Sequence, residues 1–412
     1  MKKPFLLAGA LLLSAPVLAQ QPPVAAPEPA PDVVPAAEPS GYDLLVQAGG
    51  KILPGTNGLP SSQDKLTADE NLRRQRVAVK RNAPALALVR QALQKPITVP
   101  LITDTKEPGL RTNEQMRELA RQFWQEADVR LADGDFAGAM NSRLDIIEMG
   151  VAFERGNFIS MSVGTAIEAI GRKDIAKIAS HLDATQCRAA VMRLKAIEER
   201  RPTFTEVMQQ EEQQTQILSV NTLGDLADVL KANATPEQRQ NNGIDEAEFA
   251  RIAALTPEKL RSDVTAIFAT IIESAKRPFS ASLTIQPPAE INPLLQVTLD
   301  TFAKPQSRFS YERAHAANLL LLGGLELRAQ KLEAGTYPDT FTTPVDPFSP
   351  NASPLVYKKT NEGYLLYSVG PDGKDDNGAA LQTLRTNPTT GVRTIVDQLM
   401  VESTGDIVQE VL

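Results

Sequence analysis

Apolar side chains recur every three or four residues through most of the chain between about residues 67 and 302. This spacing places them on one face of amphipathic α-helices. The start of one helix is marked by Thr67, which is followed three residues later by Glu70, as in a capping box. The breaks between the periodic segments are short, which favours antiparallel neighbours. We therefore expect a helical domain of stacked hairpins over residues 41–305.

One of these hairpins has a more specific pattern. Trp124 and Leu131 precede the sequence GDFAGAM at 134–140. The segment 116–147 resembles a single degenerate tetratricopeptide-type hairpin. A second copy at that family's period is not evident in the sequence. An ordinary helical hairpin with glycine at its turn is therefore the alternative interpretation.

The pattern changes in the last quarter of the chain. A helix is expected over 309–334, with an apolar centre that Asn318 interrupts and that is too short to span a membrane. Short β-type runs follow at 354–359 and 363–368, and a turn signal joins them. The segment 405–412 can supply a further strand. The fold class expected is therefore mainly α, with a small α+β region at the C-terminus.

Four short motifs follow one another in this C-terminal region. They are Tyr337-Pro338, Asp346-Pro347-Phe348, the run LLYSVGPDG at 365–373, and Gly405-Asp406-Ile407-Val408. Their order and spacing resemble the globular head of the major pseudopilins of type II secretion systems, over roughly residues 310–412. The resemblance implies a domain, here 306–412, in which one long helix packs on a β-meander. The prepilin cleavage motif and membrane helix of that family are missing, so we do not expect a pilin subunit.

The resemblance also implies a metal site. In that family the loop after this run binds calcium, and the matching ligands here are Asp372 and Asp406. Asp375 and Asp376 lie close enough in sequence to join them. Ca²⁺ takes about six to eight oxygen ligands, which carboxylates on a glycine-containing loop can supply in part. Gly405 stands where the family has a second acidic residue, so a plain solvated turn stays open as the alternative to a Ca²⁺ site.

The N-terminus has the form of a secretory signal peptide. Lys2 and Lys3 precede an apolar stretch, and small residues lead to a predicted cut after Ala19. Residues 20–40 are rich in proline and alanine, a composition typical of an extended linker. We expect a periplasmic or extracellular protein whose mature chain has no membrane span.

Charge and cysteine content narrow the function classes. The chain has 43 basic and 50 acidic residues and a net charge of −7, which loss of the leader's two lysines would make −9. An acidic chain is a poor ligand for phosphate backbones, so we do not expect nucleic-acid binding. Cys187 is the single cysteine, so no internal disulfide can form. No HExxH, GxSxG or phosphate-cradling glycine loop occurs in the sequence.

Few side chains suit catalysis. His181 and His315 are the only histidines, which argues against histidine-based catalysis and zinc binding. We expect His181 near a helix C-terminus, and His315 and Cys187 on apolar faces. Glu206, Glu211 and Glu212 lie on one glutamine-rich helix, and we expect them on its solvated face.

These observations favour an exported, non-enzymatic scaffold or binding protein. Its C-terminal domain would be stabilised by calcium, and its helical domain would offer a surface to a protein partner in the cell envelope. Two alternatives stay open. One is an enzyme that acts on envelope polymers through carboxylates. The other is an accessory component of a secretion or pilus-like assembly.

Overall fold

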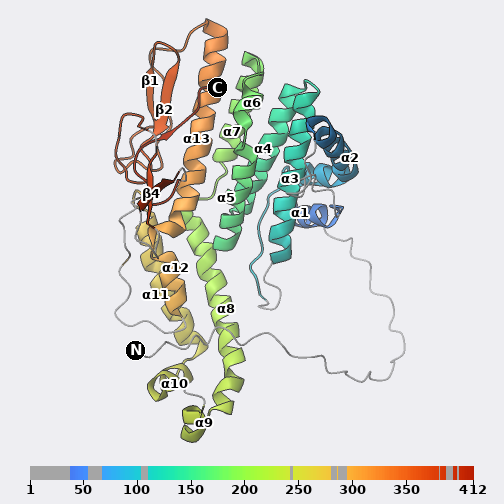
Figure 1. Cartoon of the computed structure of the whole chain (residues 1–412). Helices are drawn as coiled ribbons and strands as arrows, with labels where there is room; N and C mark the ends of the chain where they lie inside the picture. Colours follow the sequence, from blue (N-terminus) through green and yellow to red (C-terminus); the bar gives the residue numbers. More distant parts are fainter. Residues whose placement is uncertain are drawn as a thin grey trace, which may run out of the picture. The chain divides into compact units, whose positions relative to one another are not determined.

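A computed structural model describes most of the chain: residues 38–53, 67–103, 110–241, 245–279, 285, 295–379, 381–386, 393–396 and 399–412. The expected signal peptide and nearly all of the linker lie outside these residues. Contacts group Pro39–Leu412 into one compact unit. The described part of this unit contains thirteen helices and five short strands, which confirms a mainly α fold with a small antiparallel sheet (Figure 1).

The helices are α1 (Gly41–Gly50), α2 (Ala68–Ala92), α3 (Leu110–Ala132), α4 (Phe136–Phe153), α5 (Phe158–Arg172), α6 (Ile175–Ala179), α7 (Ala184–Glu198), α8 (Phe204–Ala232), α9 (Pro236–Asn241), α10 (Glu246–Ala253), α11 (Pro257–Ala275), α12 (Gln296–Phe302) and α13 (Pro305–Ala334). The connections between α3 and α8 are short, as expected, whereas those from α1 to α2, from α2 to α3 and from α11 to α12 are long. The capping box predicted at α2 is present: the Thr67 side chain accepts from the Glu70 amide, and Glu70 accepts from the Thr67 amide.

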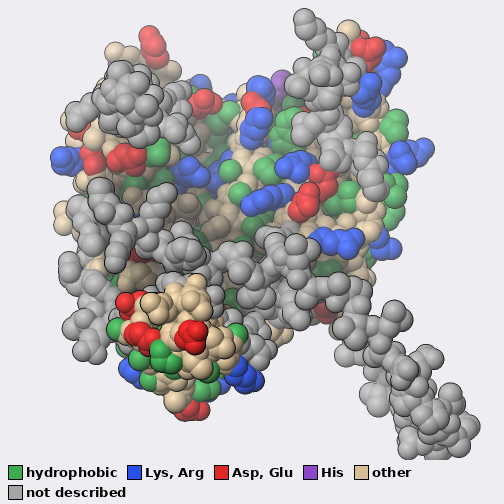
Figure 2. All heavy atoms as spheres, turned by 60° about the horizontal axis from the view of Figure 1, so that its bottom comes forward, with side chains coloured by type: hydrophobic (Ala, Val, Ile, Leu, Met, Phe, Trp, Pro, Cys, Tyr) green, Lys and Arg blue, Asp and Glu red, His purple; other side chains and the backbone are tan. Residues whose placement is uncertain are grey.

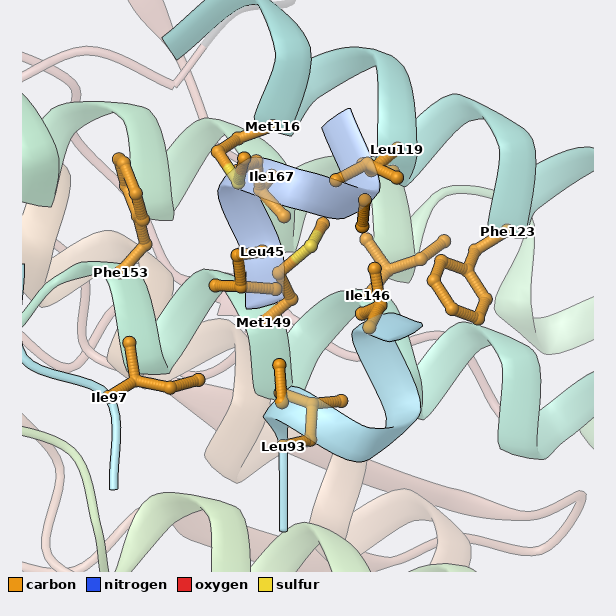
Figure 3. Packing of buried hydrophobic residues seen from close by; sticks show 14 of the residues in the cluster. Leu45, Leu93, Ile97, Met116, Leu119, Phe123, Ile146, Met149, Phe153 and Ile167 are labelled. Carbon is orange, nitrogen blue, oxygen red and sulfur yellow. The ribbon is translucent and has the colours of Figure 1, made fainter. Parts of the chain in front are cut away.

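Neighbouring helices pack as antiparallel hairpins at the N-terminal end of this unit. Helices α1 to α5 share one apolar core, to which α1 contributes Leu45, α3 Phe123, α4 Met149 and α5 Ile167 (Figure 3). Helices α8 and α11 form a further pair. Among the described residues, no helix combines the length and the hydropathy needed to cross a bilayer.

The C-terminal strands form two small sheets. Strands β1 (Val356–Lys359), β2 (Tyr364–Ser368) and β5 (Ile407–Val408) make an antiparallel sheet in the order β1-β2-β5. The β1–β2 hairpin is the one that the two apolar runs predicted. A second hairpin, β3 (Thr383–Thr386) with β4 (Arg393–Val396), lies in a stretch for which no strand was expected.

Helix α13 is covered on two sides, which explains why apolar residues surround its centre. One side packs on helix α7, and Leu321 and Leu325 on this side belong to the same core cluster as residues of α4 and α7. The other side packs on the sheet, where Leu320 belongs to the same core cluster as Tyr364 and Leu366 (Figure 1). A helix that is apolar on all sides is typically buried. The boundary expected near residue 305 falls just before α13, which joins the cores of both regions.

Candidate functional site

A groove runs along helices α2, α4 and α7 and the segment 93–98 that follows α2. It consists of two adjoining hollows of about 630 Å³ and about 410 Å³. Leu93, Gln94, Glu148 and Arg200 line both. This groove was not predicted from the sequence, because its walls come from helices that are far apart in the chain.

The wider hollow carries a row of ion pairs that begins at α3. The Glu126 carboxylate bridges Arg130 and Arg90, with Nη2 to Oε distances of 3.3 and 2.5 Å. Ser142 donates to the same carboxylate at 2.7 Å. Arg90 also reaches the next helix, because its Nε lies 2.8 Å from Oδ2 of Asp145. One arginine of α2 thus joins carboxylates of α3 and α4.

The row continues across α4 to α7. Nη2 of Arg193 lies 2.5 Å from Oδ1 of Asp145 and 2.8 Å from Oε2 of Glu148. Nη2 of Arg200 lies 2.6 Å from Oε1 of Glu148. Asp145 and Glu148 are three residues apart on α4, and the two arginines are seven apart near α7, so each pair faces the same way. Arginines and carboxylates therefore alternate along the groove.

The carboxylates of this row are more deeply buried than the arginines. The carboxylates of Asp145 and Glu148 are 6% and 11% exposed, whereas the side chains of Arg90 and Arg200 are 37% and 52% exposed. The carboxylates therefore lie below and hold the guanidinium groups from beneath. An arginine has five N–H donors in a rigid fork, so a guanidinium held on one side still presents donors on the other.

The pKa values of two groups in this row, Glu126 and Arg193, are shifted in the direction that favours their charged forms. Burial alone would raise the pKa of Glu126, but hydrogen bonds from Arg90 and Ser142 and the nearby arginine charges outweigh it, so this pKa lies below its ordinary value. Burial would likewise lower the pKa of Arg193, and the carboxylates of Asp145 and Glu148 reverse the effect. Both shifts favour the charged forms of Glu126 and Arg193.

A second charged cluster lies deep between helices α4, α5, α7 and α13. Arg201 reaches three glutamates: Nη1 is 2.6 Å from Glu154, Nη2 is 2.6 Å from Glu168, and Nε is 2.9 Å from Glu198. Asn318 of α13 donates to both Glu168 and Glu198 at 2.6 Å. These side chains are almost wholly buried, so the cluster joins four helices and is closed to a ligand.

Glu154 and Glu168 differ in protonation although they are hydrogen-bonded to each other. Burial raises the pKa of Glu154 well above its ordinary value. The Arg201 charge opposes this shift, and the neighbouring glutamates add to it. Burial would also raise the pKa of Glu168, but the charges of Arg201 and Arg172 lower it to about 2. We assign the shared proton to Glu154, since two adjacent buried carboxylates cannot both be ionised at low cost.

The histidines and the cysteine lie close to where they were expected. Cys187 is buried in the core between α4, α7 and α13. His315 is half-buried and its Nε2 lies 3.6 Å from Glu198; burial lowers its pKa, and the Glu198 charge opposes the shift. His181 stacks on Phe136 with 4.5 Å between ring centroids.

Glu211 corrects the expectation of a solvated glutamate face on α8. Its Oε2 accepts from the Phe158 amide at 2.8 Å, at the start of α5. It lines a hollow of about 250 Å³ together with Thr215 and Phe302. Burial raises the pKa of Glu211 to about 7, against the opposing hydrogen bonds from Phe158 and Thr215. Glu206 does face solvent and caps α8 through Thr203.

The structure brings Asp406 against the loop that was predicted to bind calcium. Its Oδ2 accepts from the Gly378 amide at 2.6 Å and its Oδ1 from the Asp376 amide at 3.4 Å. Asp375 accepts from the Tyr367 hydroxyl at 2.8 Å, and Asp372 accepts from the Lys374 amide at 3.2 Å. In the part of the chain that the structure describes, no three His, Cys, Asp or Glu side chains are grouped as metal ligands.

Negative charges of the loop lie near Asp406. Burial raises the pKa of Asp406, and the charges of Asp375 and Asp376 add to the shift while the two amide hydrogen bonds oppose it. Gly370 has a φ of +71°, and a Cβ there would lie 2.5 Å from the Gly405 carbonyl oxygen. The loop therefore needs glycine at 370 and gathers negative charge around one buried carboxylate.

The Asp346-Pro347-Phe348 motif proves to brace the same region. The Asp346 carboxylate accepts from the Phe348 amide, the Ser368 hydroxyl and the Val369 amide, at 3.0, 2.8 and 2.8 Å. It thereby ties the segment after α13 to the end of β2. Its burial and these three bonds explain the motif without a bound ligand.

Comparison with known proteins adds no relative. No family model, no curated protein and no solved structure matches the chain. The geometry of the groove is therefore the basis on which a function can be proposed.

Proposed function

We propose that this chain is an exported, non-enzymatic binding protein whose helical part holds a partner in the groove between α2, α4 and α7. The observation that carries the proposal is the row of half-exposed arginines held in place by buried carboxylates. Guanidinium groups fixed before binding lose little rotamer entropy when a partner arrives, so they bind more tightly than free surface arginines.

Binding fits this groove better than catalysis. Glu126, Asp145 and Glu148 are each paired with arginine, and the pKa of Glu126 lies below its ordinary value, so Glu126 is not suited to donate a proton near neutral pH. Glu211, whose pKa is raised to about 7, lines a different hollow. No second Asp or Glu lines that hollow among the described residues, whereas glycoside hydrolysis uses a facing pair of carboxylates.

The C-terminal region has a supporting role in this proposal. Helix α13 packs on α7, one of the groove-bearing helices, on one side and on the β1-β2-β5 sheet on the other. Ca²⁺ bound near Asp406 and Asp372 would stabilise the loop beside that sheet, and so the platform behind the groove. Outside the cytoplasm, calcium affinities in the millimolar range are sufficient for such a role.

Site-specific photo-crosslinking tests the binding function. Gln94 is exposed and lines both hollows, so a photoreactive residue at this position should form a discrete adduct in an envelope extract of the source organism. The same residue at Val77, which is 58% exposed on α2 outside the groove, is the control. Ala196→Trp, which fills the wider hollow from α7, should abolish the adduct. Equal labelling from Gln94 and Val77 would refute the proposal.

A further inference from the structure

The groove differs in charge from the rest of the chain. Six basic and two acidic side chains line it among the described residues, in a chain of net charge −7. Counting Glu126, which pairs from below the surface, still leaves an excess of positive charge. Figure 2 shows a face on which basic side chains lie among acidic and apolar ones. A local positive excess on an acidic protein points to a negatively charged occupant.

The two hollows differ in their walls. The wider one is lined by Arg90, Arg130 and Arg193, whereas the narrower one includes the apolar Ile97, Val151 and Ile197. Basic groups frame the narrower hollow as well, since Arg155 and Arg200 lie at its edge. The apolar wall of the narrower hollow and the arginines that line both hollows therefore lie side by side in one continuous groove. An occupant that fits both needs apolar groups beside its negative charges.

We infer that the occupant is an extended acidic segment of a partner protein, with aspartate or glutamate side chains next to at least one apolar side chain. This inference rests on the proposed binding function and names its partner class. The carboxylates would pair with the outer faces of Arg200, Arg193 and Arg90, and the apolar side chain would enter the hollow at Ile97 and Val151.

Uniform polyanions fit the groove less well. Asp145 and Glu148 are fixed between the arginines, so a chain with a charge on every unit would place some charges against these carboxylates. Repulsion between these carboxylates and the negative charges of the occupant would weaken binding. Polyphosphate and nucleic-acid backbones also lack apolar groups for the narrower hollow. A peptide can space its carboxylates to match the arginines.

A synthetic peptide tests the inference. The probe is a fluorescein-labelled twelve-residue peptide of alternating Glu and Leu, and the measurement is fluorescence polarisation against the full chain. Saturable binding is expected, and it should weaken at least about tenfold for the Gln-for-Glu peptide and for the Ser-for-Leu peptide. Equal binding of the Gln-for-Glu peptide, or tighter binding of inorganic polyphosphate of similar length, would overturn it.

Protein variants locate the binding in the groove. The double variant Arg155→Gln/Arg200→Gln keeps Glu148 paired with Arg193, so it should fold and should bind the Glu-Leu peptide at least about tenfold more weakly. Ala196→Trp should weaken binding through shape alone. Arg76→Gln is the control, because this exposed arginine pairs with Asp133 outside the groove. Unchanged binding in the double variant and in Ala196→Trp would place the peptide elsewhere and refute the inference.

The two proposals fail in different ways. A Gln94-specific crosslink that persists while the Glu-Leu peptide does not bind would keep the groove as a binding site and reject the acidic peptide. Absence of both the crosslink and peptide binding would reject the binding function itself.

Discussion

Gly150 of α4 and Gly164 of α5 face each other so closely that a Cβ on Gly164 would lie 2.5 Å from the Gly150 carbonyl oxygen. The reverse contact, from a Cβ on Gly150 to the Gly164 carbonyl, would measure 2.7 Å. Each glycine is followed four residues later by a glutamate, Glu154 or Glu168, which packs over the glycine of the other helix. The close crossing therefore lets the two buried glutamates meet.

Gly164→Ala should destabilise the protein by about 1–3 kcal/mol, because the added methyl meets backbone and forces the helices apart. Gly224→Ala is the matched control: it is in α8, and a Cβ there would have no neighbour within 4 Å. There the change should stabilise by up to about 1 kcal/mol through helix propensity. Urea unfolding of both variants measures the difference. A Gly164→Ala protein as stable as wild type would show that the crossing is not closely packed.

Arg201→Met should lower the free energy of unfolding by about 3–5 kcal/mol, because three buried glutamates lose their contact with Arg201. The control is Arg188→Met, in which an arginine with two glutamate partners, Glu326 and Glu333, is lost from a partly exposed site. That change should lower the free energy of unfolding by at most about 1 kcal/mol. Equal losses in chemical unfolding of the two variants would contradict the role assigned to the buried cluster.

The same variant has a pH signature. Arg201 helps to hold the folded-state pKa of Glu168 at about 2, below its unfolded value. That stabilisation is therefore present above about pH 4.5 and is lost as pH falls towards 2. The difference in unfolding free energy between wild type and Arg201→Met should shrink over this range. If this difference in unfolding free energy stays constant from pH 5 to pH 2.5, Arg201 does not lower the pKa of Glu168.

Local elements of this fold were accessible from sequence because their causes are local. The Thr67–Glu70 capping box spans three residues, and the β1–β2 hairpin joins two adjacent apolar runs. The helix expected over 309–334 is α13, which begins earlier, at Pro305, and ends before Gly335, which has a φ of +79°. Its burial on two sides also agrees with an apolar stretch that is too short to cross a membrane.

Both charged clusters were missed because their partners are distant in sequence. Asn318 is 150 residues from Glu168, and Arg90 is 55 residues from Asp145. The polar residue inside the apolar run of α13 was a visible signal, since a buried amide requires partners. The sequence could not show which glutamates those partners were. Glu211 was missed for a related reason: its burial comes from packing against α5 and α12.

Glu211 should make stability fall as pH rises from about 4.5 to 7. Its folded-state pKa, about 7, is raised above the unfolded value, so its contribution is fully present below about pH 4.5 and is lost as pH rises through 7. The shift corresponds to at most about 3 kcal/mol. Glu211→Gln keeps an acceptor for the Phe158 amide and should remove this dependence.

Urea unfolding at pH 5 and pH 8 measures this effect. Relative to wild type, Glu211→Gln should gain stability at pH 8 and lose most of that advantage at pH 5. Gln213→Ala, an exposed neutral change on the same helix, should keep the wild-type dependence. The same pH dependence in Glu211→Gln as in wild type would mean that the carboxyl is hydrated in solution.

Calcium should act on the C-terminal loop through Asp372 and Asp406, and these residues should behave differently. At 10 mM Ca²⁺ and millimolar affinity, wild type should gain about 1 kcal/mol over protein in chelator, or about 2–4 °C in Tm. Asp372→Ala should abolish this gain and leave the Tm in chelator nearly unchanged, because the bond that Asp372 accepts comes from the Lys374 amide two residues away in the same exposed turn.

Asp406→Ala should instead lower the Tm even in chelator, because the amides of Gly378 and Asp376 lose their acceptor. Such unsatisfied groups cost about 1–3 kcal/mol. Differential scanning calorimetry with Ca²⁺, with Mg²⁺ and with chelator separates the two effects. If neither ion moves the Tm of wild type while Asp406→Ala still lowers it, Asp406 is a hydrogen-bonding brace and the calcium proposal is wrong. If Ca²⁺ still stabilises Asp372→Ala, the ion binds elsewhere in the chain.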